Sequence, residues 1–269
     1  MSLFKVNARP SRMASMVLPF VPFLICVIAY AATAQIRHKE NPKDKLVPTV
    51  TELADGFRRS AFESDRKGEY RLLVDTIAST RRFAVGVVLL FLGVIVGLHM
   101  GVLPYAEVML YRFVLFFDKV PALALLPILF IVFGLGEVSK LALIVIGVMP
   151  TIILDTYLRA KAVPGEQITK AMTLNASNFE IMYRIVLPKI FPNVLDTVRL
   201  NFKAVILFLI AGEALAATAG LGYRIFVVRR YLAMDIIIPY VLWISLLAFL
   251  ADLAVRIWIK KRYSWVDKL

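Results

Sequence analysis

Cysteine and histidine are scarce in this sequence, which has one cysteine, Cys26, and two histidines, His38 and His99. A single cysteine excludes a disulfide within the chain and any metal site built on several cysteines. So few of these residues also leave little for nucleophilic or acid–base catalysis. The phosphate-binding pattern G-x-x-x-x-G-K-[ST] is absent too, so the sequence shows no nucleotide site of its own. We therefore do not expect an enzyme.

Acidic residues are outnumbered, with 19 Asp and Glu against 32 Lys and Arg and a formal net charge of +13. This balance suits loops that face anionic lipid head groups. Nucleic-acid binding is a poorer interpretation, because the basic residues flank apolar runs rather than cluster on one polar face. Hydrophobic residues make up 60% of the 269 residues, and the mean hydropathy is +0.76, far above that of soluble domains. The composition therefore predicts one membrane domain.

Six apolar runs are long enough to cross a membrane, which takes about 20 helical residues. They cover approximately residues 13–34, 83–103, 113–133, 141–158, 194–217 and 236–259. The runs predict an all-α, polytopic membrane protein with six transmembrane helices and both termini on one side. For the first run a cleaved signal peptide is the alternative, because Ala29-Tyr30-Ala31 and Ala32-Thr33-Ala34 look like small-residue cleavage sites. The length of the run favours an uncleaved anchor helix.

The long polar segment between the first two runs predicts helices of its own. Thr49 and Glu52 have capping-box spacing, and apolar residues then recur on one helical face as far as Ala61. Residues 70–82 lead helically into the second run. The predicted parts of the chain are an N-terminal segment with the first transmembrane helix (1–35), a partly amphipathic extracytoplasmic segment (36–82), a core of five transmembrane helices (83–259) and a cytoplasmic tail (260–269).

Glycines in the second run favour close helix packing. Gly93, Gly97 and Gly101 are four residues apart, a spacing that lets another helix approach closely. The pattern is common in membrane helices, so it predicts packing and not a binding site.

Four residues inside the predicted spans are candidates for a pathway through the membrane. Pro121 and Pro127 lie in the third run, where prolines kink a helix and free carbonyls that neighbours or water must satisfy. Lys203 and Glu213 lie in the fifth run, and ionisable groups at depth usually face the protein interior or a pathway. Two alternatives stay open: Lys203 snorkels to the interface, and Glu213 is a structural hydrogen-bond acceptor.

A polar loop, 159–192, interrupts the apolar second half of the chain. Its stretch from Pro164 to Pro192 reads PGEQITKAMTLNASNFEIMYRIVLPKIFP. Asn175-Ala176-Ser177 is a turn signal, and apolar residues recur at helical spacing on both sides of it. We predict a short helix, a tight turn and a second amphipathic helix that stops at Pro188. A loop with an apolar face and a defined turn indicates a partner surface.

This loop resembles the cytoplasmic loop of ABC-importer permease subunits, whose pattern is roughly E-A-A, three residues, G, nine residues, I-x-L-P. Ala171, Ile185, Leu187 and Pro188 fall on that pattern at the right spacing. The residues assigned to the predicted coupling loop, 164–188, are Pro164, Glu166, Thr169, Ala171, Leu174, Asn175, Ala176, Ser177, Ile185, Leu187 and Pro188.

Two positions depart from the pattern of the resembling loops. Thr169 stands where glutamate is usual, and Glu166, one turn earlier, is its possible substitute. Asn175 stands where glycine is usual. Asparagine tolerates the left-handed conformation better than other residues with a side chain, so it is the mildest replacement there.

Three further stretches resemble permeases of the taurine, sulfonate, nitrate and bicarbonate type. They are Leu46-Val47-Pro48-Thr49, the run from Val120 to Lys140, and the run from Ala211 to Tyr223. The resemblance therefore extends from about Leu46 to the C-terminus.

The resemblance implies a type I ABC importer permease fold in the inner (cytoplasmic) membrane of a bacterium. It implies two ABC ATPase subunits as partners, which would bind ATP and Mg²⁺, while this chain would hold no cofactor or metal. It also implies a second permease copy, a periplasmic or lipid-anchored solute-binding protein and surrounding lipid. The implied function is import of a small oxyanion such as nitrate, bicarbonate, a sulfonate or taurine by alternating access.

Other functions remain as alternatives. A gradient-driven secondary transporter would need paired ionisable residues at mid-membrane and repeated halves, which the sequence does not show. A membrane scaffold would not need a structured loop. An importer permease for a small organic molecule such as a thiamine precursor would share the same motifs.

Overall fold

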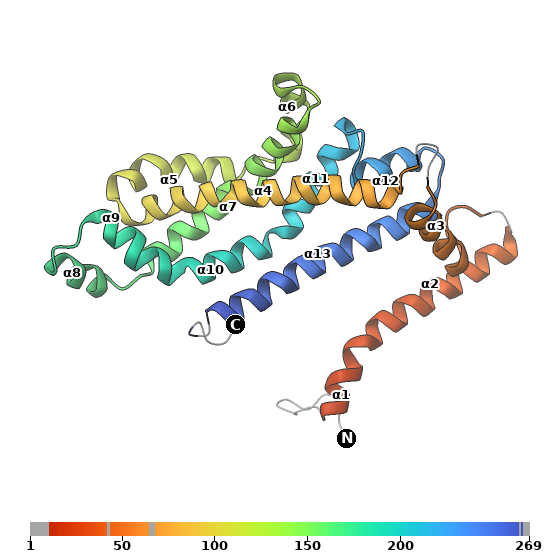
Figure 1. Ribbon diagram of the computed structural model, residues 1–269, viewed down its shortest axis with the longest axis horizontal. Helices are drawn as coiled ribbons and strands as arrows, with labels where there is room; N and C mark the ends of the chain where they lie inside the picture. The colour runs from red at the N-terminus through yellow and green to blue at the C-terminus, as the bar shows by residue number, and fades with distance from the viewer. Residues whose placement is uncertain (1–10, 42–43, 65–67, 264, 266–269) are drawn as a thin grey trace.

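The computed structural model describes residues 11–41, 44–64, 68–263 and 265, whose arrangement Figure 1 shows. All regular structure in these ranges is helical, apart from one antiparallel bridge between Ser64 and Tyr70. The helices are α1 (Arg12–Val17), η1 (Leu18–Phe20), α2 (Val21–Glu40), α3 (Val50–Phe62), α4 (Arg71–Val102), α5 (Pro104–Asp118), η2 (Ala122–Leu125), α6 (Leu126–Phe133), α7 (Glu137–Lys161), α8 (Gly165–Thr173), α9 (Asn178–Glu180), η3 (Ile181–Val186), α10 (Leu187–Leu200), α11 (Phe202–Ala216), α12 (Leu221–Arg229) and α13 (Met234–Arg262). The all-α prediction is confirmed.

Up to six spans are present in the described part of the chain, in agreement with the sequence. Four helices are long and apolar enough to cross a membrane: Arg12–Glu40, which joins α1, η1 and α2, and the helices α4, α7 and α13. Two bent pairs complete the six if each counts as one span: α5 with η2 and α6, and α11 with α12. As predicted, α4 begins well before its apolar run, at Arg71.

The predicted third span is not one kinked helix. Its two parts, α5 and the segment η2–α6, meet at 83°. Pro121 precedes η2, and Pro127 lies in the first turn of α6, so neither proline lies in the interior of a helix. Proline is tolerated in a first turn because its missing N–H would have no intrahelical partner there. The two prolines therefore start new helices instead of bending one.

The predicted helix stop at Pro188 is wrong. The chain stays helical from Asn178 to Leu200, with Pro188 in the first turn of α10. The π-helical segment η3 ends two residues before this proline and covers the turn in which an α-helix would lose a backbone hydrogen bond and meet the proline ring. The fifth run is instead divided at Asn201, between α10 and α11.

The central contact of the fold is between α4 and α7. Gly93, Gly97 and Gly101 face α7, as their spacing predicts, and a methyl group at Gly97 would lie 2.5 Å from the backbone oxygen of Ile153. Lipid is as apolar as leucine, so close van der Waals packing is what favours such a contact in a membrane. Fully or almost fully buried side chains surround it, namely Leu90, Val94, Leu98, Ile144, Val148 and Ile152.

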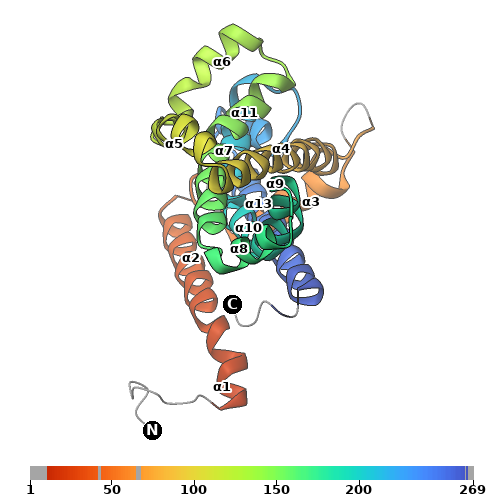
Figure 2. The same ribbon diagram turned by 90° about the vertical axis from the view of Figure 1, so that its left-hand side faces the viewer.

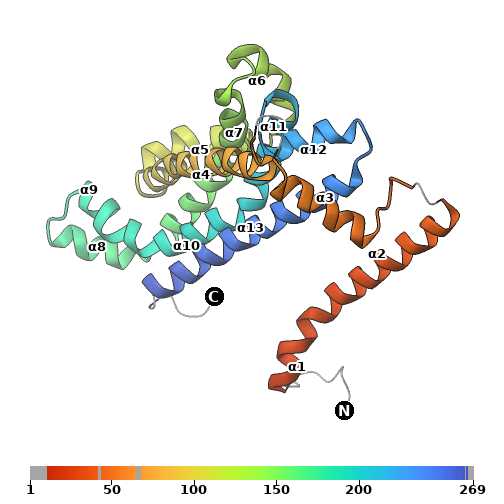
Figure 3. The same ribbon diagram turned by 45° about the vertical axis from the view of Figure 1, so that its right-hand side comes forward.

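The N-terminal helix stands apart from the other spans, as Figures 2 and 3 show. No part of its apolar window is buried. Contacts occur near its end, where the Tyr30 hydroxyl donates to the Pro48 carbonyl at 2.7 Å and Arg37 pairs with Asp44 at 2.6 Å. The helix continues to Glu40, past the predicted boundary at residue 35, and the division into four parts stays a prediction.

The amphipathic helix α3 covers the start of α13. The predicted capping box between Thr49 and Glu52 is present at its N-terminus. Gly56 lies so close to α13 that a methyl group there would be 2.1 Å from the Asp235 carbonyl oxygen, and Arg59 pairs with the Asp235 carboxylate at 2.6 Å. The polar segment is therefore attached to the bundle at the end opposite to α8 and α9 (Figure 1).

Candidate functional site

Helices α8 and α9 and the turn between them lie at one end of the molecule, on the left in Figure 1. Asn175 has a φ of 60°, so the predicted left-handed turn residue is confirmed. The Ala176 N–H donates to the Ala171 carbonyl at 3.0 Å and closes the end of α8. The helix–turn–helix prediction holds up to this point, although the second helix is longer than expected.

A capping box begins the second helix of the loop. The Ser177 hydroxyl accepts from the Glu180 N–H at 3.3 Å, and the Ser177 N–H donates to a Glu180 carboxylate oxygen at 3.1 Å. Hydrogen bonds from the Ser177 N–H and hydroxyl, together with the charge of Arg184, lower the pKa of the Glu180 carboxyl. The spacing S-x-x-E from Ser177 to Glu180 is visible in the sequence and is the signal that predicts this capping box.

The apolar residues of the loop divide into a buried and an exposed set. Ala171 is buried against the chain's own core, together with Ile181 and Met182. Leu174 and Phe179 flank the turn and are 83% and 64% exposed. We call Leu174 and Phe179 the loop tip. The surface available to a partner is therefore the loop tip and not Ala171.

The other predicted loop residues belong to the same helix–turn–helix unit. Pro164, Glu166, Thr169 and Pro188 are exposed, whereas Ala176, Ile185 and Leu187 pack partly against the core. The Thr169 hydroxyl donates to the Gly165 carbonyl within α8 at 3.0 Å. Lys189 donates to the Gln167 side chain at 2.8 Å and joins α10 to α8.

Hydrogen bonds join the helices that enter and leave the loop. Thr197 of α10 accepts from Arg159 of α7 at 2.9 Å and donates to Asp155 of α7 at 2.7 Å. The Tyr157 hydroxyl of α7 donates to Glu107 of α5 at 2.6 Å. These contacts make α5, α7 and α10 one connected base, through which a displacement of the loop would reach the bundle.

Glu213 lies toward the opposite end of the molecule and is fully buried. Its carboxylate accepts from the Ser79 hydroxyl at 2.8 Å, from Arg82 Nη1 at 2.7 Å and from the Gly222 N–H at 2.9 Å. These contacts are those of a structural hydrogen-bond acceptor. The sequence had left this role and that of a pathway residue open for Glu213.

The contacts of Glu213 belong to a polar network that holds the 54° bend between α11 and α12. The first N–H groups of a helix have no intrahelical acceptor. Here Gly220 donates to Asp75 at 2.9 Å and Leu221 donates to Ser79 at 2.8 Å. Gly220 has a φ of 139°, and a methyl group on it would lie 2.5 Å from the Glu213 carboxyl carbon. Side chains of α4 therefore hold the start of α12 in place.

The sequence contained a signal for the α4 part of this network. Asp75, Ser79 and Arg82 are spaced by four and three residues, which places them on one face of a helix. The partner Glu213 is more than 130 positions away along the chain, so the pairing could not be read from local spacing.

The polar network is balanced in charge. Arg82 pairs with both Glu137 and Glu213, Lys140 pairs with Glu137, and Arg224 pairs with Asp75. Three cations thus offset three carboxylates, so no surplus charge is left to hold a charged solute. Within the described ranges, no group of three or more His, Cys, Asp or Glu is placed to hold a metal ion.

The four pathway candidates are not brought together at one site. Pro121 and Pro127 belong to the break between α5 and α6. Lys203 is exposed at the start of α11, and Glu213 is ten residues farther along the same helix, or about 15 Å at 1.5 Å per residue. Their assignment to a pathway stays a prediction.

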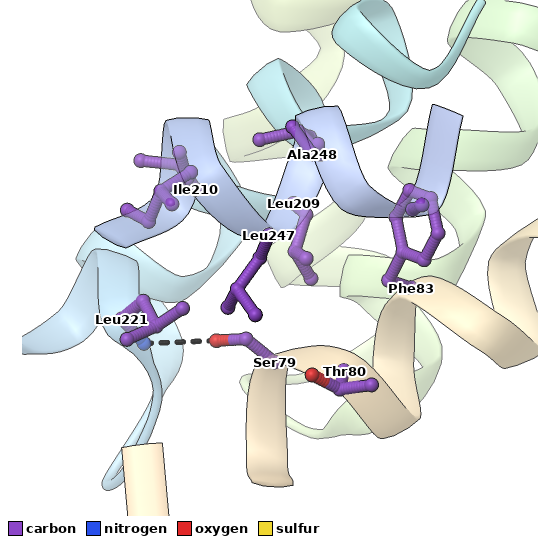
Figure 4. A pocket seen from close by; sticks show the side chains of 11 residues that line it. Ser79, Thr80, Phe83, Leu209, Ile210, Leu221, Leu247 and Ala248 are labelled. Atoms are coloured by element: carbon purple, nitrogen blue, oxygen red, sulfur yellow. Dashed lines mark hydrogen bonds between the residues drawn. The ribbon is translucent and has the colours of Figure 1, made fainter. Parts of the chain in front are cut away.

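An apolar pocket of about 130 Å³ lies between α4, α11, α13 and the start of α12 (Figure 4). The Ser79 hydroxyl at its edge already accepts from the Leu221 N–H and donates to Glu213. The remaining lining is apolar apart from Thr80, so the pocket has little with which to recognise a polar solute. The lining residues are Ser79, Thr80, Phe83, Ile206, Leu209, Ile210, Leu221, Ile244, Leu247, Ala248 and Ala251.

Comparison with known proteins gives consistent matches. The taurine transport system permease protein TauC of Escherichia coli (strain K12) is 31% identical over 173 residues, which cover 64% of this chain and 63% of that protein. The nitrate import permease protein NrtB of Synechococcus elongatus is 26% identical over 211 residues, covering 77% of this chain and 76% of that protein. The match to the taurine permease thus spans less than two thirds of its length.

A solved structure shares the fold. A chain of the MetNI methionine ABC transporter, in an inward-facing conformation, superposes with a TM-score of 0.61 at 18% identity and covers 73% of this chain and 98% of that chain. The family described as "binding-protein-dependent transport system inner membrane component" matches residues 90–262, which include the loop, the α4–α7 contact and the α11–α12 bend. The chain therefore belongs to this family of ABC importer permeases and has the type I permease fold.

Proposed function

We propose that this chain is the pore-forming subunit of an ATP-driven importer and that residues 164–188 couple it to two ATPase subunits. The observation that carries the proposal is the capped helix–turn–helix, whose loop tip exposes Leu174 and Phe179. Exposed apolar side chains on an otherwise polar loop mark a protein contact. The match of residues 90–262 to the permease family supports the same partner.

The proposed mechanism is a lever. ATP and Mg²⁺ bind to the ATPase subunits, and this chain contributes no group to that chemistry. Closure of the ATPase pair brings the loops of two permease copies together. The contacts of Thr197 with Arg159 and Asp155 pass the displacement to α7 and α10. The pathway then changes from inward- to outward-open, provided that the ATPases bind the two states with different affinity.

We place a solute-binding protein at the opposite end of the molecule. A polar hollow of about 1000 Å³ lies there between α3, the segment before it and the turn that leads into α13. Charged side chains of both signs line it, including Lys45, Asp55, Arg58 and Glu63. Such a surface suits a transient, polar contact with a soluble partner. In this proposal the loop lies in the bacterial cytoplasm and the hollow lies outside the inner membrane.

The proposed solute is a small oxyanion such as nitrate, bicarbonate, a sulfonate or taurine. The names of the taurine and nitrate permeases support this class. A small organic molecule, such as a thiamine precursor, is the alternative substrate, and a gradient-driven transporter is the alternative function.

Purification of the tagged chain from its native membrane in mild detergent, followed by mass spectrometry, tests the importer proposal. We expect an ABC ATPase in near-stoichiometric amount and a solute-binding protein after mild cross-linking. The co-purified binding protein is then screened with nitrate, bicarbonate, taurine and alkane sulfonates. A chain that purifies without an ATPase in several detergents would overturn the proposal and favour the gradient-driven alternative.

A further inference from the structure

The break between α5 and η2 carries an ion pair that the sequence analysis missed. Lys119 pairs with Asp118 at 2.8 Å, and the other Asp118 carboxylate oxygen accepts from the Thr151 hydroxyl of α7 at 2.9 Å. Thr151 lies about 21 Å from Glu137 and about 15 Å from Lys161, the two ends of α7, at 1.5 Å per residue. The hydrocarbon core of a bilayer is about 30 Å thick, so the pair lies close to its middle.

The cation is the member of the pair that faces outward. The Lys119 side chain is 73% exposed, whereas the Asp118 side chain is 15% exposed and uses both of its oxygens. An ammonium group has three N–H donors, and Asp118 takes one of them. Two donors on Lys119 are therefore free for another acceptor.

Lipid is a poor environment for this surface. An exposed ammonium is costly at the centre of a bilayer. The backbone from Lys119 to Pro121 is also irregular, and such backbone occurs at membrane depth only where protein covers it or where it lines a water-filled cavity. An exposed lysine needs water, so a water-filled cavity accounts for both the exposed ammonium and the irregular backbone.

Lys203 of α11 lies at a similar level along the bundle to Thr151 of α7, the hydrogen-bond partner of Asp118. Phe208 of α11 touches the position of Gly147 in α7, where a methyl group would lie 2.4 Å from the phenyl ring. The two helices run in opposite directions, since α10 and α11 lead away from the loop into which α7 runs. Lys203 is five residues before Phe208 and Thr151 is four residues after Gly147, so both lie about 6 to 8 Å from that contact toward the loop.

We propose that Lys119 lines the water-filled translocation pathway and holds a substrate oxyanion at mid-membrane, with Asp118 and Thr151 as positioning residues. The inference rests on the importer function proposed above. Sulfonate or nitrate oxygens accept from the two free N–H groups, and such charge-assisted bonds are short and strong. The polar network around Glu213 is not such a site, because its charges are already paired. Exposed Lys203 adds a second positive charge at about the same height.

Thiol labelling in the assembled transporter tests whether Lys119 meets water. Cys26 is the only cysteine, so Cys26→Ser provides a cysteine-free background. Lys119→Cys is compared with Leu92→Cys, an exposed α4 position next to Gly93, which packs against Met149 and Ile153 at a similar height. We expect a charged, membrane-impermeant methanethiosulfonate to modify Lys119→Cys about tenfold faster or more, because thiols in apolar surroundings stay protonated. Equal rates would overturn the inference.

Uptake of radiolabelled nitrate and taurine tests the anion contact. Lys119→Gln should lower the maximal uptake rate about tenfold, the effect of one charge-assisted hydrogen bond, and leave the KM unchanged because the binding protein delivers the solute. Lys119→Arg should retain clearly more uptake than Lys119→Gln, since it keeps a positive charge and N–H donors although its planar geometry differs. Unchanged uptake by Lys119→Gln, or equal loss in both variants, would refute the role of the charge.

The two proposals can fail separately. An unmodified chain that purifies without an ATPase contradicts the importer function, while fast labelling of Lys119→Cys would still support a water-filled path. If the ATPase is present with Lys119→Gln at its normal amount and uptake is normal, the inference about Lys119 fails alone.

Discussion

The two ends of this molecule are built on different principles. The loop is made from contacts between near neighbours, such as the capping box of Ser177 and Glu180 and the left-handed turn at Asn175. The polar network at the other end joins α4 to the α11–α12 bend through Ser79, Arg82 and Glu213, more than 130 positions apart. A locally built, exposed unit can move against a partner without losing its shape, whereas a buried network fixes the geometry of the bundle.

The energetic consequences differ in the same way. A hydrogen bond on the exposed loop contributes about 0.5 to 1.5 kcal/mol. Removal of one partner from a buried ion pair costs about 3 to 5 kcal/mol, because the remaining charge is left without compensation. We therefore expect substitutions in the network to affect stability, and substitutions in the loop to affect partner binding.

The largest effect is expected for Glu213→Ala. The Ser79 hydroxyl, the Gly222 N–H and Arg82 Nη1 lose this acceptor, although Arg82 keeps its pair with Glu137. Each buried donor left unsatisfied costs about 1 to 3 kcal/mol, so the free energy of unfolding should fall by about 3 to 5 kcal/mol. Glu213→Gln should cost less because it keeps one acceptor. Denaturant titration in detergent micelles measures both. A loss below that of Ser79→Ala would show that the network is not a structural unit.

Gly220→Ala tests the bend directly. Its φ of 139° is strained for any residue with a side chain, and the added methyl group would lie 2.5 Å from the Glu213 carboxyl carbon. Strain of this kind costs about 1 to 3 kcal/mol. Gly136→Ala is the matched control, because nothing lies within 4 Å of a methyl group there. Equal unfolding free energies for the two variants would contradict the crowding at Gly220.

Leu174→Asp should separate binding from stability. The side chain is exposed at the loop tip, so the free energy of unfolding should change by no more than about 0.5 kcal/mol. Affinity for the ATPase should fall about tenfold or more if this residue anchors the contact. Leu46→Asp, an exposed leucine at the other end, is the control for both measurements. Equal ATPase recovery from the two variants would remove the loop tip from the interface.

Because Ala171 is buried, a substitution at this position does not test ATPase binding separately from folding of the loop. Ala171→Asp would place a carboxylate among Ile181 and Met182, so loss of the ATPase would accompany local unfolding of the loop. Leu174→Asp avoids this ambiguity. The resemblance to the family pattern points to this loop, but only the structure shows which side of α8 faces outward.

Local patterns predicted the parts of the fold that depend on local physics. The capping box at Thr49, the close helix approach at Gly97 and the left-handed Asn175 all follow from spacing and residue type. In the third run a kink at the prolines was predicted, but the chain breaks by 83°, because proline at a helix start and proline inside a helix look alike in an apolar run. The 54° bend between α11 and α12 was missed, since no proline marks it. Continuation of the helix through Pro188 depends on the π-helical turn η3 before it.

The candidate site was predictable to a lesser degree. Residues 164–188 form one unit because they are consecutive in the chain. The network of Asp75 and Glu213 required long-range pairing, which spacing does not encode. Asp118 and Lys119 were missed because an ion pair inside an apolar run is notable only when its depth is known. That depth comes from the hydrogen bond between Asp118 and Thr151.

The smallest effect is expected for Asn175→Gly, the loop counterpart of the change at Gly220. Asn175 is exposed and already adopts a φ of 60°, where glycine is at least as favourable. Glycine adopts this φ more easily, which stabilises the folded state, but it also raises the conformational entropy of the unfolded chain. Because these two effects oppose each other, the unfolding free energy should change by less than about 1 kcal/mol. Uptake and ATPase recovery should match those of the unmodified chain. A loss of uptake with normal stability would mean that the Asn175 amide itself contacts the ATPase. Asn175 would then belong to the interface together with the loop tip.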